Sequence, residues 1–179
     1  MLTHTTYTNP VRTVKGAPFF TAIETPVLKP LMYLTIALSP LVWLMNWMSY
    51  LNGSSHLTTK RTSFGGAEMW EQVDFAALFQ AKASPAVLAR GMLGMMRYDA
   101  SETLRRIDVP ALVIAGEIDP VCKPDASERM SRDIPEAELR TLPLAKHLGF
   151  IEHHETFAEL VQEFATAQRR SGVAEQALA

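Results

Sequence analysis

Residues 110–120 read PALVIAGEIDP, and this stretch decides how the chain is expected to fold. Its continuous apolar run, bounded by proline and glycine, is typical of a strand buried on both faces of a parallel sheet. A helix opened by proline is expected over residues 124–133, a second strand over residues 137–142, and an amphipathic helix from residue 149 or 151 to residue 169. Strand, helix, strand and helix in this order predict a parallel, right-handed crossover unit.

Two polar side chains follow the two strands of this unit. Asp119 lies in the turn after the first strand, and His147 lies after the second, in LPLAKHLG, residues 142–149. Loops converge at the carboxyl ends of parallel strands, so we expect the two side chains to form a hydrogen bond within about 3.2 Å, or somewhat longer without the missing half. In such a pair the carboxylate orients the imidazole and stabilises the imidazolium. The pair therefore predicts the acid and base of a Ser-His-Asp type site.

The nucleophile of such a site is missing. In the chain order nucleophile, acid, histidine, it would precede Asp119, but no Gly-x-Ser-x-Gly, nor a cysteine or aspartate version of it, occurs there. The sequence therefore contains two of the three members of a catalytic site.

The residues around the pair resemble a known family. Residues 107–121 resemble the penultimate strand and acid turn of α/β-hydrolases, and residues 135–153 resemble their last strand, histidine loop and closing helix. Lys146 departs from the family pattern, which more often has glycine there, and so does the pair His153-His154, where His-Pro is commoner. The resemblance implies the α/β class: a partial α/β-hydrolase fold, with a few parallel strands, flanking helices and an inserted helical cap.

The same resemblance implies a division of the whole chain. Residues 1–14 would hold a first core strand and turn, residues 15–100 a helical cap, residues 101–170 the C-terminal core, and residues 171–179 a frayed tail. The serine elbow and the oxyanion loop would then precede Met1. We therefore expect a fragment without its nucleophile, inactive by itself, that leaves a strand edge unpaired and pairs with a missing N-terminal half.

The composition argues against several other classes of protein. The 179 residues are 47% hydrophobic with a net charge of −2, which suits one globular domain and gives no basic excess for a nucleic-acid partner. One cysteine excludes an internal disulfide and is compatible with a reducing compartment. The first ten residues lack the cationic start and apolar stretch of a signal peptide, so we expect a cytoplasmic protein.

The segment before residue 100 is expected to be mostly helical. A short strand is predicted over residues 2–8, a helix over residues 30–51 with a break near Pro40, and further helices over residues 74–80 and 84–98.

The stretch LMYLTIALSPLVWLMNWMSYL, residues 31–51, has three interpretations. A cap over an apolar acyl-substrate pocket is preferred, because ligand pockets are mostly apolar. Attachment to a membrane surface is the alternative, since Trp43, Trp47 and Tyr50 belong to residue types favoured at interfaces. A transmembrane span is least favoured because Pro40 interrupts it.

Other nucleophile candidates have simpler interpretations. Ser54 and Ser55, followed by His56, are expected to form a polar turn, since adjacent loop residues rarely meet as a nucleophile and base. Cys122 is close to Asp119 but no elbow surrounds it, so we expect an ordinary thiol.

The other acid and histidine candidates are also expected to have structural roles. Asp99 is expected to cap the helix that begins near Ser101 rather than to act as an alternative acid. His153 and His154 are expected at the surface. Together with His147 they lack carboxylate or cysteine partners at ligand spacing, so no metal site and no cofactor are expected.

The family resemblance implies an esterase, lipase or peroxidase-like hydrolase of a small apolar or acyl substrate. His147 would act as general base and then general acid, and Asp119 would orient it. The rival hypotheses are a non-enzymatic fragment that binds lipid or membrane, and a truncated product without function.

Overall fold

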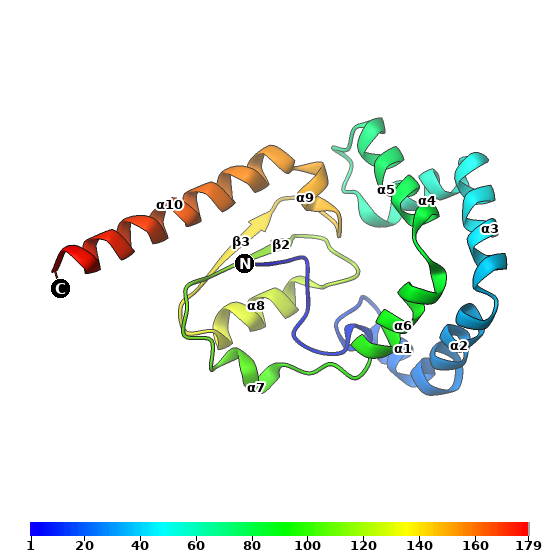
Figure 1. Cartoon of the computed structure of the whole chain (residues 1–179), viewed down its shortest axis with the longest axis horizontal. Helices are drawn as coiled ribbons and strands as arrows, with labels where there is room; N and C mark the ends of the chain where they lie inside the picture. The colour runs from blue at the N-terminus through cyan, green and yellow to red at the C-terminus, as the bar shows by residue number, and fades with distance from the viewer. Residues whose placement is uncertain (179) are drawn as a thin grey trace.

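The computed structural model describes residues 1–178, with side chains described for residues 1–170 (Figure 1). The tail that we expected to be frayed, residues 171–179, lies outside the residues described in full. Within the described part the sheet has three parallel strands in the order β1-β2-β3. They are β1 (Leu2–Thr3), β2 (Ala111–Gly116) and β3 (Ala137–Leu142).

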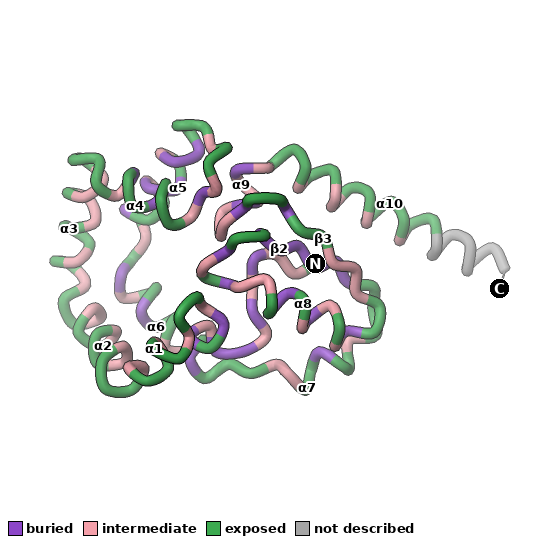
Figure 2. The backbone as a smooth tube through the Cα atoms, turned by 180° about the vertical axis from the view of Figure 1, so that it is seen from behind, coloured by how far each residue is buried: buried purple, intermediate pink, exposed green. Residues whose placement is uncertain are grey.

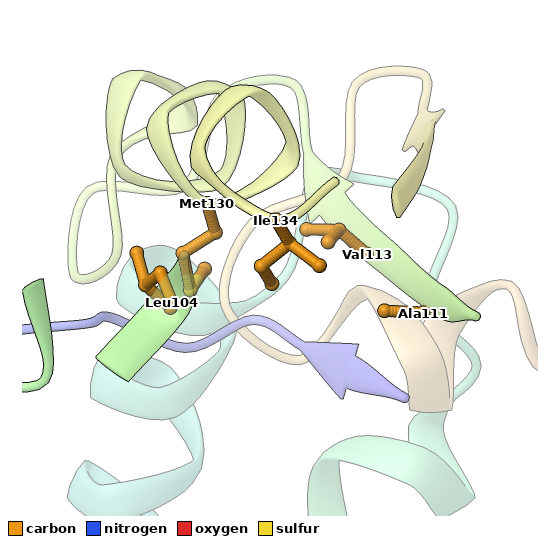
Figure 3. Packing of buried hydrophobic residues seen from close by; sticks show 5 residues of the cluster. All are labelled: Leu104, Ala111, Val113, Met130 and Ile134. Atoms are coloured by element: carbon orange, nitrogen blue, oxygen red, sulfur yellow. The ribbon is translucent and has the colours of Figure 1, made fainter. Parts of the chain in front are cut away.

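Strand β2 is the buried centre of the fold. All six of its residues are buried (Figure 2), so its apolar side chains are covered on both faces of the sheet. Ala111 and Val113 point to one face, where they pack with Met130 and Ile134 of the segment around α8 (Pro124–Asp133), as seen in Figure 3. The expected β2-α8-β3 crossover is confirmed, with the predicted bounds for α8 and β3.

The other face of β2 packs against the C-terminal helix. Leu112 and Ile114 contact the partly buried Phe157, Leu160 and neighbouring residues of α10 (His154–Leu178). A short helix, α9 (Gly149–Glu152), precedes α10, and His153 separates the two. The single closing helix expected over residues 149–169 is therefore two helices.

The remaining helices all precede β2 in the chain. Together α1 to α6 form a helical layer beside the sheet, on the right in Figure 1. In chain order the helices are the 3-10 turn η1 (Pro10–Arg12), α1 (Ala17–Ile23), the π-helical η2 (Glu24–Leu28), α2 (Lys29–Ala37), α3 (Ser39–Leu51), α4 (Ser54–Ser63), α5 (Trp70–Lys82), α6 (Pro85–Met95) and α7 (Ser101–Leu104).

The predicted break near Pro40 is present. Helix α2 ends at Ala37 and α3 begins at Ser39, with Pro40 in the first turn of α3, where its missing N–H is tolerated. Across the described residues, no helix alone has the length and apolar character to cross a membrane. The pair Ala17–Ala37 and Ser39–Leu51, bent by 92°, passes that test only when taken together.

Two further local predictions were wrong. The first strand covers Leu2 and Thr3 rather than residues 2–8, because His4 has a left-handed φ of 44° that ends the extended run. Ser54 and Ser55 do not form a polar turn but begin α4, and Gly53, with φ of 82°, makes the turn instead.

Candidate active site

The acid and the histidine expected to pair are in contact. His147 Nδ1 donates a hydrogen bond to Asp119 Oδ2 at 3.0 Å, which confirms the predicted contact. The Asp119 side chain is fully buried, whereas the His147 side chain is 33% exposed. The carboxylate is therefore fixed inside the protein, and the imidazole stands between it and the surface.

Backbone groups of the acid turn hold the Asp119 carboxylate. Its Oδ1 accepts hydrogen bonds from the N–H groups of Val121 at 2.7 Å and Cys122 at 3.0 Å. Oδ1 is thus occupied within its own turn, and Oδ2 is left to the imidazole. The turn itself is closed by a hydrogen bond from Asp119 N to Gly116 O at 3.3 Å.

The acid turn and the histidine loop approach each other at Gly116. A Cβ at this position would lie 2.6 Å from Ala145 O and 2.8 Å from Lys146 O, so only glycine fits between the two segments. Ile118 N donates to Ala145 O at 3.1 Å, which adds a backbone link between the same segments. These contacts bring the two side chains to hydrogen-bonding distance.

Glu152 links α9, which follows the histidine loop, to the helical layer through hydrogen bonds. This buried carboxylate of α9 accepts three backbone N–H groups from the loop before α5: Gly65 at 2.8 Å, Gly66 at 2.9 Å and Ala67 at 2.7 Å. Glu152 was not singled out from the sequence. The adjacent Gly65-Gly66 pair is the one local signal for it, because small residues let backbone approach a carboxylate closely.

Two more hydrogen bonds join the histidine loop to the end of α4. Lys146 Nζ donates to Arg61 O at 2.7 Å, and Leu148 N donates to Ser63 O at 2.9 Å. Lys146 stands where the family pattern more often has glycine, and its side chain is directed to the helical layer.

A second histidine, His4, lies beside His147 and was also missed. Its ring centroid is 6.3 Å from that of His147 in an edge-to-face arrangement, and the residue is 6% exposed. It follows β1, which pairs in parallel with β2, so its ring reaches the same end of the sheet as Asp119.

The serine pair does not meet a base in the described residues. His56 Nε2 instead bonds to Asp74 Oδ1 at 2.9 Å, and its ring stacks on Trp70 at 5.2 Å between centroids. This hydrogen bond, followed by one from the Tyr50 hydroxyl, lowers the pKa of Asp74. The pair joins α4 to α5 and is a histidine–carboxylate contact that sequence spacing did not reveal.

The other candidates behave as ordinary structural groups. Asp99 Oδ1 accepts from Ser101 N at 3.0 Å and from Ser101 Oγ at 2.6 Å, so Asp99 binds the first residue of α7, although the N-cap position itself is Ala100. Burial, and then the charge of Asp119, raise the pKa of Cys122 to about 12. His154 is exposed, as expected, whereas His153 is half-buried. Among the described residues, no cluster of three or more His, Cys, Asp or Glu side chains is suited to hold a metal ion.

An apolar pocket of about 240 Å³ opens next to the acid turn. Val121, two residues after Asp119, forms part of its wall. The helical layer supplies much of the rest, including Phe20, Leu28, Met32, Met92 and Met96. The acid turn and the helical layer therefore share an apolar cavity.

Comparison with known proteins gives the same family as the sequence motifs. The family model described as the alpha/beta hydrolase fold matches residues 28–154. Among curated proteins, a pimeloyl-[acyl-carrier protein] methyl ester esterase of Neisseria meningitidis is 32% identical over 81 residues, which cover 45% of this chain and 32% of the relative. The match thus spans about a third of the length of that curated relative.

Solved structures of similar proteins share the architecture. A thermophilic esterase from Thermogutta terrifontis is 28% identical, with a TM-score of 0.51 over 54% of this chain and 36% of its own. An α/β hydrolase enzyme from a Medee basin deep-sea metagenome library is 17% identical, with a TM-score of 0.58 over 92% of this chain and 54% of its own. The second likeness shows the fold alone. With the family model matching well over half of its residues, the chain belongs to the α/β-hydrolase fold family.

Proposed function

We propose that this chain carries the acid and the histidine of a serine-esterase site that hydrolyses an acyl ester with an apolar acyl part. The observation that carries the proposal is the hydrogen bond of 3.0 Å between His147 Nδ1 and Asp119 Oδ2 at the carboxyl ends of neighbouring parallel strands. The esterase character of the similar proteins supports it.

His147 is the proposed general base. Because Nδ1–H is donated to Asp119, Nε2 is the nitrogen that accepts the proton of a serine hydroxyl while the serine oxygen bonds to the acyl carbon. The imidazolium then donates that proton to the leaving alkoxide. Water attacks the acyl-enzyme in the second half of the cycle, and His147 again takes a proton and returns it to the serine oxygen.

Asp119 has an orienting role in this proposal. It keeps the imidazole in the tautomer with Nδ1 protonated and stabilises the imidazolium. The proposed chemistry requires neither a metal nor a cofactor, since the reaction consists only of acyl and proton transfers.

The nucleophile is proposed to come from a segment beyond these 179 residues, because the sequence contains no Gly-x-Ser-x-Gly. Strand β1 lies at the end of the strand order, so its outer edge has no partner strand within the described residues and can accept one. A strand added there would end near His4 and His147, on the side of the sheet where the catalytic groups converge.

The helical layer is the proposed cap, covering residues 15–100. The apolar pocket beside Val121 supports an apolar acyl chain as its occupant, because apolar lining surfaces favour apolar ligands. The name of the Neisseria relative gives a pimeloyl-[acyl-carrier protein] methyl ester as that protein's substrate. For this chain we propose the broader class, an ester with an apolar acyl part.

A second candidate function is binding to a lipid surface without catalysis. It is favoured by the exposed apolar side chains of α2 and α3, whose backbone alternates between green and pink in Figure 2, with no residue coloured as buried. These include Leu31, Leu34, Leu41, Trp43, Leu44, Met45 and Met48. Exposed apolar patches of this kind mark contact surfaces.

Two proteins test the esterase proposal: the chain alone, and the chain extended by the reading frame upstream of Met1. Each is treated with a fluorophosphonate probe and assayed on short- and long-chain p-nitrophenyl esters. We expect no labelling and no turnover for the chain alone, and labelling of one new serine with turnover for the extended protein. His147→Ala in the extended protein should abolish both. An upstream frame without a serine elbow, or labelling of Ser54 or Ser55 in the chain alone, would overturn the proposal.

A further inference from the structure

His4 occupies a strained position directly after β1. Its N–H donates to Ile114 O at 3.0 Å, so the backbone is still paired with β2, yet its φ of 44° is left-handed. Histidine tolerates this region better than bulky or β-branched residues do. The conformation ends the strand and places the His4 ring among residues of the histidine loop.

The His4 ring is held on several sides. Its Nδ1 shares a hydrogen bond of 3.0 Å with Thr3 Oγ1. The ring meets His147 edge-to-face at 6.3 Å and Phe150 edge-to-face at 5.7 Å between centroids. The contact with His147 packs the His4 ring directly against the imidazole of the proposed base.

Gly149 provides the space for this ring. A Cβ on Gly149 would lie 2.8 Å from His4 Nε2 and 3.3 Å from His4 Cε1, so the ring rests against the backbone at the start of α9. His4 Nε2 is buried and meets no partner at full hydrogen-bond geometry among the described residues, although the backbone of Lys146 lies near enough to raise the pKa of the ring. The ring is therefore held by its packing and by the Nδ1 hydrogen bond.

The Asp119 hydrogen bond does not by itself hold the His147 ring. The His147 side chain is 33% exposed, and rotation about its Cα–Cβ or Cβ–Cγ bond would break the contact between Nδ1 and Asp119 Oδ2 and turn Nε2 away from a nucleophile. A ring packed edge-on against the imidazole restricts this rotation, since aromatic rings prefer edge-to-face contacts.

We propose that His4 is a positioning residue that holds the His147 imidazole, so that Nδ1 stays on Asp119 and Nε2 stays directed at the nucleophile. Its importance for catalysis rests on the proposed esterase function, whereas the restraint on His147 is a property of this chain itself. The charge state of His4 agrees with this role. Burial is the largest influence and lowers the pKa of His4; Asp119 raises it, His147 lowers it and the backbone of Lys146 raises it, and the net lowering favours the neutral ring.

NMR of the full chain tests the restraint without any catalytic assay. The observable is the downfield Nδ1–H resonance of His147 and its exchange rate with water, compared in the unmodified chain, His4→Ala and His4→Phe. We expect exchange to rise roughly tenfold in His4→Ala, the factor that corresponds to losing an interaction of about one hydrogen bond. His4→Phe restores the edge-on ring and should keep exchange close to that of the unmodified chain. His56→Phe, at a buried histidine of the helical layer, is the control for unspecific destabilisation and should leave the resonance in place.

The outcomes separate positioning from simple packing. Lower thermal stability in His4→Ala with an unchanged His147 resonance would overturn the proposal, and so would faster exchange in His4→Phe equal to that in His4→Ala. If His4→Ala does not fold, His4→Leu replaces it, and equal exchange in the Leu and Phe variants would be the contradicting result. In the extended protein His4→Ala should lower kcat about tenfold at unchanged KM. Absence of all esterase activity would count against the proposed function, and the NMR test of His4 would still stand.

Discussion

At the scale of single residues, the contact between Asp119 and His147 depends on groups that belong to neither side chain. The N–H groups of Val121 and Cys122 occupy Asp119 Oδ1, which leaves Oδ2 for the imidazole. Gly116 has no side chain, and for that reason the histidine loop can approach the end of β2. The turn residues around the acid therefore determine the direction of its carboxylate oxygens, which explains why the motif includes more than the acid itself.

Cys122 should be inert in the folded chain. Burial raises its pKa to about 12, so at about pH 8 only about one thiol in ten thousand is ionised, and the thiolate is the reactive form. We expect iodoacetamide to modify Cys122 in urea and to leave it unmodified under native conditions, as measured by mass spectrometry. Native labelling at the rate seen in urea would contradict the buried position. The variant Cys122→Ala is the control that measures labelling of other residues.

His4 should make stability depend on pH. Its pKa is lowered in the folded state from 6.5, chiefly by burial, so folding favours the neutral ring. The contribution of His4 is therefore fully present above about pH 6.5 and is lost as the pH falls through the lowered folded-state pKa. Urea unfolding at several pH values should show a larger loss of stability on acidification for the unmodified chain than for His4→Phe. Parallel pH profiles for the two proteins would contradict the prediction.

At the scale of elements, α9 connects the histidine loop to the helical layer. Glu152 accepts three backbone N–H groups from residues 65–67, far away in the sequence. Gly65 is required there, since a Cβ would lie 1.9 Å from Leu144 O. The position of the histidine loop thus depends on a segment of the helical layer as well as on the sheet.

Removing the Glu152 carboxylate should destabilise the chain. Glu152→Ala leaves partly buried backbone N–H groups without partners, at a cost of about 1–3 kcal/mol. Glu152→Gln keeps one acceptor oxygen, so its loss of stability should be smaller than that of Glu152→Ala. Urea denaturation gives the free energy of unfolding, and Glu155→Gln, at an exposed position in the first turn of α10, is the matched control. A loss in Glu152→Ala no larger than that in Glu155→Gln would show that the three hydrogen bonds contribute nothing measurable.

The elements that could be predicted are those with local signals. Proline and glycine bound β2, and proline opens α8, so the crossover unit and the placement of Asp119 and His147 followed from the sequence. The elements that could not be predicted depend on contacts between distant residues. The hydrogen bonds from Glu152 to the loop before α5 join residues up to 87 positions apart. Strand β1 ends early because His4 adopts a left-handed φ. No periodicity or turn motif encodes either feature.

At the scale of the whole molecule, α2 and α3 carry exposed apolar side chains that are either a cap surface or a lipid-binding surface. Trp43 and Trp47 pack edge-to-face at 6.0 Å, and Trp43 is 44% exposed. A cap would bury this surface against a substrate or a further part of the protein. A lipid-binding surface would retain its affinity for vesicles in the extended protein.

Liposome flotation should distinguish these two roles. The extended protein is compared with its Trp43→Ser/Trp47→Ser variant. We expect equal and negligible flotation of both, because the apolar side chains of α2 and α3 serve as a cap in the preferred proposal. Flotation of the extended protein that the double substitution abolishes would instead support attachment to a membrane surface.

The central claim is that Asp119 is the acid that orients His147 in an esterase site. Steady-state ester hydrolysis by the extended protein tests it most directly, with Asp119→Asn compared with Asp99→Asn. Asp99 is the alternative acid, and in the structure its carboxylate accepts hydrogen bonds from Ser101, the first residue of α7. We expect Asp119→Asn to lower kcat by about three to four orders of magnitude, because asparagine does not stabilise the imidazolium and can favour the wrong tautomer. Asp99→Asn should leave kcat within about a factor of three, since only an exposed cap is altered. Near-normal kcat for Asp119→Asn, or a larger loss for Asp99→Asn, would contradict the claim.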